Sequence, residues 1–158
     1  MNQYPKILVY GYGNPGRQDD ALGVLLAENI RSWTSEKKSC NISVETNYQL
    51  NIEDAANING KDLVVFADAS KEDIEDFILT DLAPAAKVEF SMHQVSPAFV
   101  LYLCGNLFET FPKSFMLHIK GYSWDFQEGL TEKGCQNLNK ASEYIKSFIT
   151  NYISEYKD

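Results

Sequence analysis

The chain has 158 residues, of which 44% are hydrophobic and 23% charged, so we expect one globular domain over residues 1–158 rather than a disordered or fibrous protein. Its 22 acidic and 14 basic side chains give a net charge of −8, which disfavours nucleic-acid partners because phosphate binding relies on basic patches. No apolar run reaches the ~20 residues that a membrane-spanning helix needs, and the first residues lead into a strand-like run rather than a signal peptide, so we expect a cytoplasmic protein without membrane contact.

The first half of the chain alternates between strand and helix patterns. Lys6–Tyr10 is a β-rich run that ends at a glycine cluster, and apolar residues then recur at helical spacing over Leu22–Trp33. Ile42–Val44 alternates like a strand, and Ile52–Ile58 predicts a short helix. The run Leu63–Ala67 is apolar without interruption, which predicts a strand buried on both faces.

The alternation continues in the second half. Ile74–Leu79 is a weaker element of uncertain type, and Val88–Phe90 predicts another strand. A serine and a proline begin a predicted helix over Ser96–Cys104, which the following glycine is expected to end. Phe115–Ile119 predicts the last strand, and a long amphipathic helix is expected from Thr131 onward.

This alternation predicts an α/β fold, namely a three-layer α/β/α domain of the phosphorylase/hydrolase-like kind. The central twisted sheet should have about five strands and be largely parallel, with helices on both faces. In such folds the functional residues gather at the carboxyl ends of the strands.

Acidic residues and one histidine follow three of the expected strands. Asp19 and Asp20 come after the first strand. Asp68 directly follows the uninterrupted apolar strand, and His93 lies in a loop between a strand and a helix. Two carboxylates and an imidazole suit a divalent transition metal, so these residues are candidate metal ligands.

Each of these residues also has a structural interpretation. Asp19 and, to a smaller extent, Asp20 are typical of acidic helix caps, which satisfy free amide hydrogens. Asp68 is harder to explain this way, because an unpaired carboxylate at the tip of a buried strand is costly. His118 lies within an apolar strand and is expected to be structural.

The glycine cluster Gly11–Gly16 also suits two other classes of protein. It matches the G-x-G-x-x-G pattern of dinucleotide-binding domains, yet the carboxylates of Asp19 and Asp20 would oppose a phosphate at the following helix. The cluster is also similar to the opening of peptidyl-tRNA hydrolases, but Arg17–Gly23 contains no histidine and the chain is acidic. Both classes are kept as less favoured alternatives.

Motifs in order along the chain resemble the peptidases that mature nickel-iron hydrogenases. Gly11–Asn14 is similar to the first motif of that family, followed by the acidic pair Asp19–Asp20 and then Gly23. Asp68–Ala69 stands where the family has its central aspartate, and Ser91–His93 precedes a helix as the metal-contacting histidine of the family does. The resemblance covers nearly the whole chain.

The resemblance implies an endopeptidase that removes a C-terminal extension from a nickel-iron hydrogenase large-subunit precursor after nickel insertion. It gives Asp20, Asp68 and His93 the metal-contacting and catalytic role, with nickel supplied by the substrate and another divalent ion as a substitute. We expect metal-assisted hydrolysis without a covalent intermediate. A noncatalytic metal-binding or precursor-binding maturation chaperone is the main alternative.

Overall fold

The computed structural model describes residues 4–36, 41–86 and 95–156. Helices and strands alternate along most of the chain, and a short 3₁₀ helix, η1, precedes the first α-helix. The elements in chain order are β1 (Lys6–Tyr12), η1 (Gln18–Ala21), α1 (Leu22–Ser35), β2 (Asn41–Asn47), α2 (Asp54–Ile58), β3 (Leu63–Ser70), β4 (Phe77–Leu82), α3 (Pro97–Phe108), β5 (Lys113–Lys120) and α4 (Glu132–Tyr156). Among the described residues, no helix is both long and apolar enough to cross a membrane.

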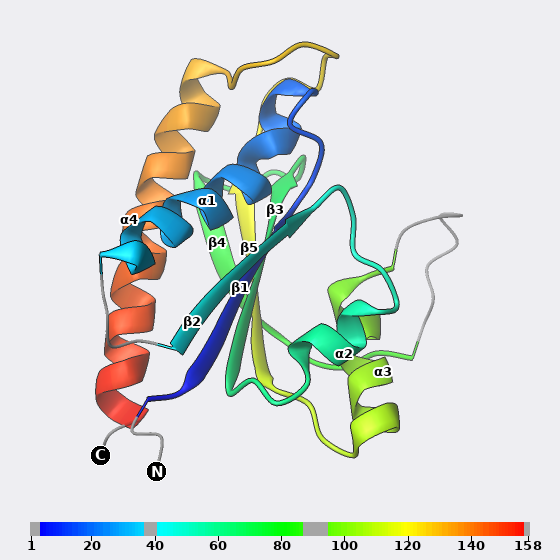
Figure 1. Ribbon diagram of the computed structural model, residues 1–158. Coiled ribbons are helices and arrows are strands. Elements are labelled where there is room, and N and C mark those ends of the chain that lie inside the picture. Colours follow the sequence, from blue (N-terminus) through cyan, green and yellow to red (C-terminus); the bar gives the residue numbers. More distant parts are fainter. Residues whose placement is uncertain (1–3, 37–40, 87–94, 157–158) are drawn as a thin grey trace.

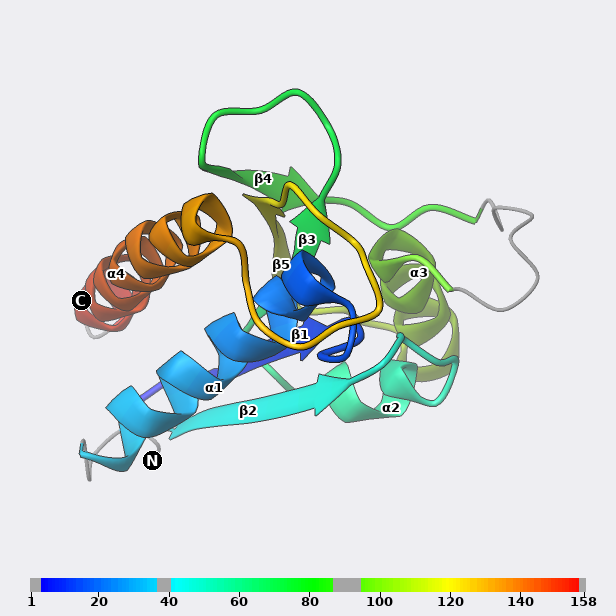
Figure 2. The ribbon, with the colours of Figure 1, turned by 90° about the horizontal axis from the view of Figure 1, so that it is seen from above.

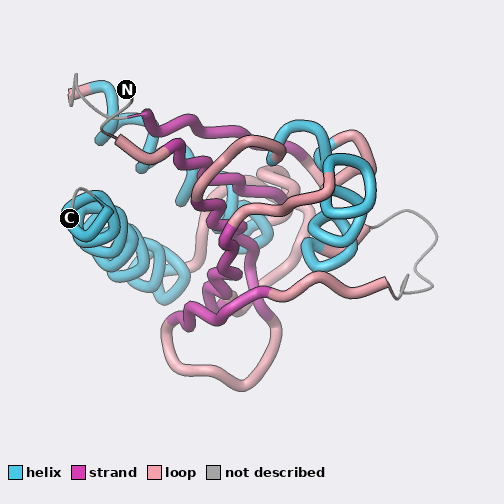
Figure 3. Tube along the Cα trace, turned by 90° about the horizontal axis from the view of Figure 1, so that it is seen from below, coloured by secondary structure: helices cyan, strands magenta, loops and turns pink. Residues whose placement is uncertain are grey.

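The strands form one five-stranded sheet in the order β2-β1-β3-β5-β4. Strands β2, β1, β3 and β5 run parallel to one another, while β4 pairs with β5 in the antiparallel direction (Figure 1). The predicted largely parallel sheet of about five strands is therefore confirmed, and its strands fan with the usual twist (Figure 3).

Helices cover both faces of the sheet, which confirms the three-layer arrangement. Helices α1 and α4 lie on one face, and α2 and α3 lie on the other (Figure 2). Each face has its own apolar core, to which the strands contribute alternate residues. In β3, for example, Val65 belongs to the core under α1 and α4, whereas Phe66 belongs to the core under α2 and α3. The predicted burial of this strand on both faces is thus confirmed.

Helix α1 approaches the sheet closely at its first turn. A Cβ atom on Gly23 would collide with the carbonyl oxygen of Ala67 on β3, and one on Gly11 would collide with the backbone of Gly23. Two residues without side chains therefore let the beginning of α1 rest directly on β1 and β3. This contact brings the turn before α1 next to the end of β3.

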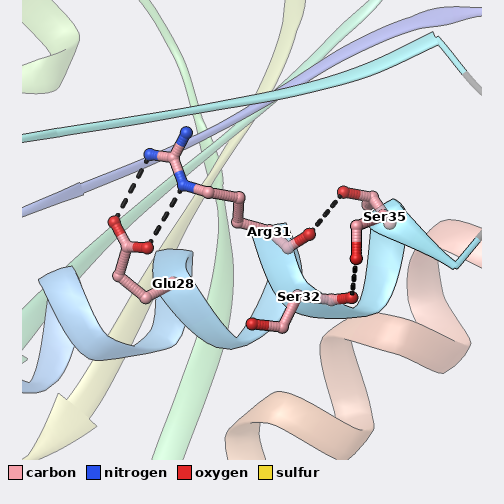
Figure 4. A network of polar contacts seen from close by, with 5 residues as sticks. Glu28, Arg31, Ser32 and Ser35 are labelled. Carbon is pink, nitrogen blue, oxygen red and sulfur yellow. Dashed lines mark hydrogen bonds and ion pairs between the residues drawn. The ribbon is translucent and has the colours of Figure 1, made fainter.

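The opposite, solvent-facing side of α1 carries ordinary surface polar contacts. The guanidinium of Arg31 donates to the carboxylate of Glu28 at 3.2 Å, and the hydroxyl of Ser35 donates to the carbonyl of Ser32 at 2.7 Å (Figure 4). An exposed pair of this kind contributes about 0.3–0.5 kcal/mol to helix stability. This part of α1 thus needs no functional explanation.

The structure differs from the sequence predictions at two elements. The weak element near Ile74–Leu79 is the antiparallel edge strand β4, which begins at Phe77. Helix α3 begins at the predicted Ser96 cap, whose Oγ accepts from the Phe99 amide at 3.1 Å, but it continues past Gly105 to Phe108. The cost of one glycine inside a helix, about 1 kcal/mol, is smaller than the gain from burying an apolar helix.

The expected strand over Val88–Phe90 lies outside the described residues. The element that the sequence placed before His93 therefore stays a prediction. The fifth strand of the described sheet is β4, which pairs with β5 over Phe77–Leu82.

Candidate active site

A pocket of about 210 Å³ lies at the carboxyl edge of the parallel strands. Its lining residues come from the ends of β1 and β3, from η1, from the segment after β2 and from the beginning of α3. The lining residues are Tyr12, Gly13, Asp20, Tyr48, Gln49, Leu50, Asp68, Val95, Ser96 and Pro97. The structure thus brings Asp20 and Asp68, which are 48 residues apart in the sequence, into one pocket.

Asp68 lies near the carboxyl end of β3, just beyond the fully buried part of the strand. The pKa of its carboxyl is raised from 3.8 to about 7, chiefly because the group is buried. The Ala69 amide, which donates to Oδ1 at 2.8 Å, acts to lower this pKa, and the nearby charge of Asp20 acts to raise it. A nearby cation would favour the charged form of this carboxyl, which burial makes costly to ionise.

Asp20 reaches the pocket from η1. Its Oδ2 accepts a hydrogen bond from the Asn14 amide at 2.9 Å, so the carboxylate fixes the glycine loop that it faces. Gly13, beside it, has a φ of 141°, a conformation that residues other than glycine rarely adopt. The glycine motif that the sequence analysis singled out therefore shapes the wall next to Asp20.

Asp19 is fully buried and takes a structural part that differs from the predicted one. It makes no side-chain cap for its own helix. Its carboxylate instead accepts from the Tyr122 amide at 2.7 Å, the Thr131 amide at 2.9 Å and the Thr131 hydroxyl at 2.7 Å. Asp19 thus holds the loop before α4 against η1, and the expectation of a cap on its own helix was wrong because its partners come from the far end of the chain.

His93 lies outside the described residues, so its place in the predicted set stays a prediction. Val95, two residues later, is part of the pocket wall. Within residues 4–36, 41–86 and 95–156, no three His, Cys, Asp or Glu side chains gather in a group that could hold a metal ion. The described residues therefore supply the two carboxylates of the predicted set.

His118 is a half-buried residue on β5, where the sequence analysis expected a structural side chain. It lies in register with Asp68 of β3, and its Nε2 is 3.4 Å from the hydroxyl of Thr80 on β4. Burial lowers the pKa of the imidazole, and the charge of Glu72 raises it. These contacts join the two last strands of the sheet.

Two tyrosines of the pocket were not singled out from the sequence. Tyr12 was treated only as the variable residue of the glycine motif, yet it lines the pocket; burial and then the charge of Asp68 raise its pKa well above the usual value. Tyr48 follows β2 and is 68% exposed at the rim. An aromatic residue shortly after a predicted strand was the available signal for Tyr48.

The two alternatives based on the glycine motif find little support in this geometry. In a dinucleotide site the amides after the first strand face a phosphate. Here the Asn14 amide is taken by Asp20, and the Asn14 side-chain oxygen accepts from the Gly16 amide at 2.8 Å. A carboxylate of the chain itself thus stands beside the loop where an anion would bind.

Several solved structures with the same architecture are hydrogenase maturation proteases. The NiFe hydrogenase maturation protease HycI from Thermococcus kodakarensis KOD1 superposes with a TM-score of 0.71, at 23% identity over 92% of this chain and 93% of that one. The chain has the fold of the hydrogenase maturation proteases. The maturating endopeptidase HybD from E. coli gives a TM-score of 0.66 at 20% identity, covering 93% of both chains.

A third solved structure extends the likeness, the NiFe hydrogenase maturation protease HybD from Thermococcus kodakarensis. It superposes with a TM-score of 0.61 at 18% identity, over 91% of this chain and 99% of that one. By sequence, no family model and no curated protein matches the chain. The resemblance seen in the sequence motifs is therefore confirmed as a likeness of fold along nearly the whole chain.

Proposed function

We propose that this protein is an endopeptidase that removes a C-terminal extension from a nickel-iron hydrogenase large-subunit precursor after nickel insertion, acting in the cytoplasm. The observation that carries the proposal is the meeting of Asp20 and Asp68 in one pocket at the carboxyl edge of a maturation-protease fold. The sequence motifs that resemble this family place the same two residues in its metal-contacting set.

The donor chemistry of the pocket fits a divalent ion that arrives with the substrate. Two carboxylates offer oxygen ligands and leave open positions, and the proposed imidazole of His93 would complete a set suited to nickel. The raised pKa of Asp68 agrees with such a site, because a bound cation would favour the charged form of this carboxyl. A bound ion supplies Lewis-acid chemistry, because it polarises a carbonyl oxygen or lowers the pKa of a bound water.

The Ser96 hydroxyl is engaged in a structural contact rather than activated as a nucleophile. Ser96 lines the pocket, but its Oγ accepts from the Phe99 amide as the cap of α3. A serine nucleophile needs a base within hydrogen-bond reach, which this contact does not provide. This supports hydrolysis by an activated water without a covalent intermediate.

Mass spectrometry of the precursor tests the proposed reaction. The purified chain is incubated with precursor that carries nickel and, separately, with precursor prepared without metal. We expect the nickel-loaded precursor to lose a C-terminal peptide and the metal-free precursor to stay intact. A nickel-loaded precursor that keeps its full mass would overturn the proposal, and a precursor that is bound but uncut would indicate the chaperone alternative.

Substitution Asp68→Asn tests the central carboxylate, because it keeps the shape of the side chain and removes its charge. We expect cleavage of the nickel-loaded precursor to fall by about 100-fold or more, as happens when groups around a reacting metal are removed. The matched control is Asp81→Asn on the far edge strand, where the carboxylate is exposed and pairs with Lys113. Far-ultraviolet circular dichroism of both variants checks folding, and full activity of Asp68→Asn would remove this residue from the mechanism.

A further inference from the structure

A second hollow lies next to the candidate active site. It has a volume of about 270 Å³ and shares Gly13 and Tyr48 with the pocket that contains Asp20 and Asp68. Its full lining consists of Gly13, Pro15, Val24, Thr46, Asn47 and Tyr48. Because Val24 belongs to α1, this hollow lies on the other side of the glycine loop from α3.

The loop that lines both hollows is firmly held at Gly13. Gly13 presents no side chain, and a Cβ atom there would collide with the backbone oxygen of Asp20. The Gly13 amide donates to the Asn47 carbonyl at 3.0 Å, which ties the loop to the end of β2. A polypeptide bound along the carboxyl edge of the sheet would therefore meet a fixed loop at Gly13, with Tyr48 beside both hollows.

The lining of the second hollow selects for an uncharged side chain. None of its six lining residues is charged, although the chain as a whole is 23% charged. Pro15 and Val24 offer apolar surface, and the exposed Tyr48 also lines the hollow. A charged side chain placed here would lose water without gaining a partner, which is unfavourable.

We infer that this hollow is a substrate subsite, which takes an aliphatic side chain of the precursor close to the scissile bond and whose size is set by Val24. The inference rests on the proposed function, since it assumes an extended polypeptide in the pocket of Asp20 and Asp68. Side chains of an extended chain point alternately to opposite sides, so a residue near the cut faces away from the pocket of the two carboxylates. Val24 is thus a specificity-determining residue.

A precursor panel tests this subsite. Each residue on either side of the cleavage position is replaced in turn by valine, phenylalanine and aspartate, and kcat/KM is measured for the wild-type chain and two variants. At one position we expect the wild type to cleave the valine precursor at least about tenfold faster than the aspartate precursor. Val24→Phe should lose at least about tenfold on the valine precursor, and Val24→Ala should shift the preference toward phenylalanine.

The matched control is Ser32→Phe, which adds the same ring to the exposed part of α1, away from both hollows. It should cleave the panel like the wild type. Thermal melting should show a cooperative unfolding transition for every variant, which establishes that each one is folded. The subsite is overturned if the wild type cleaves the precursor while Val24→Phe and Val24→Ala keep its order of preference at every position. Failure of the wild type to cleave any nickel-loaded precursor overturns the proposed function itself, and the subsite with it.

Discussion

Asp68 carries an electrostatic cost that should make the stability of the protein depend on pH. Its pKa is about 7 in the folded protein and near 3.9 in an unfolded chain, so between these values the folded state binds the extra proton. Stability therefore falls as pH rises from about 4 to 7, because the folded state must give up a proton that the unfolded state has already released. Above pH 7 the full cost of the buried charge is present.

The Asp68→Asn variant should remove this dependence in metal-free buffer. As the pH rises from 5 to 8, the free energy of unfolding of the variant should increase by about 1–2 kcal/mol relative to that of the wild type. This figure allows for the partial solvent contact of Asp68, which reduces the effect of its charge. Urea unfolding at both pH values with a chelator present measures the difference. The exposed Asp81→Asn variant controls for the loss of one charge, and an equal response of the two variants would contradict the assignment.

At the scale of elements, one buried carboxylate connects three parts of the chain. Asp19 in η1 accepts hydrogen bonds from Tyr122 in the loop before α4 and from Thr131 at the entry to that helix. The backbone of the loop adds to this contact, since the Asp19 amide donates to the Ser123 carbonyl at 3.1 Å. Because Asp20 is the next residue, the same contact holds the turn that faces the pocket.

Substitution Asp19→Ala should therefore destabilise the protein by about 2–5 kcal/mol, since it leaves the partly buried amides of Tyr122 and Thr131 without their acceptor. Urea unfolding gives the magnitude, and hydrogen exchange should show faster exchange at those two amides. The control is Asp125→Ala in the same loop, whose carboxylate only receives a long 3.4 Å bond from Ser123. If Asp19→Ala lost no more stability than this control, Asp19 would not connect these elements.

At the scale of the whole molecule, a single sheet separates two apolar cores. Ile145 of α4 is fully buried in one core and Leu101 of α3 in the other. Strand β3 contributes residues to both cores, so neither can be lost without exposing the other face of the strand. The protein should thus unfold as one unit.

We expect Ile145→Ala and Leu101→Ala each to lower the free energy of unfolding by about 2–5 kcal/mol, the usual cost of a cavity in a packed core. Both variants should keep a single transition that coincides by circular dichroism and tryptophan fluorescence. The exposed Leu107→Ala on α3 is the control and should change stability little. Separate transitions in either core variant would show that the two layers unfold independently.

Local patterns account for most of the elements that were predicted correctly. Leu63–Ala67 predicted a strand buried on both faces because such a strand needs apolar residues at every position, and the residue after the run had to lie at the carboxyl edge. The same reasoning placed Asp20 at that edge after β1. Helix α3 was predicted too short because the cost of Gly105 is local, whereas the packing that outweighs it is not.

Several features of the site depend on contacts between distant parts of the chain. Asp19 meets Thr131 across 112 residues, and no local pattern distinguishes this contact from an ordinary helix cap. Tyr48 and Val24 border the site because β2 pairs beside β1 and α1 packs on the sheet through Gly23. These positions follow from strand order and close packing.

The sequence by itself determined the type of most elements, the three-layer class and the presence of Asp20 and Asp68 at the carboxyl edge, because hydrophobic periodicity and parallel strands are set within short segments. Only the tertiary structure decided that β4 runs antiparallel at the edge, that Asp19 anchors the entry to α4 and that the two carboxylates share one pocket beside a second hollow. These depend on which surfaces pack together, and packing is a property of the whole chain.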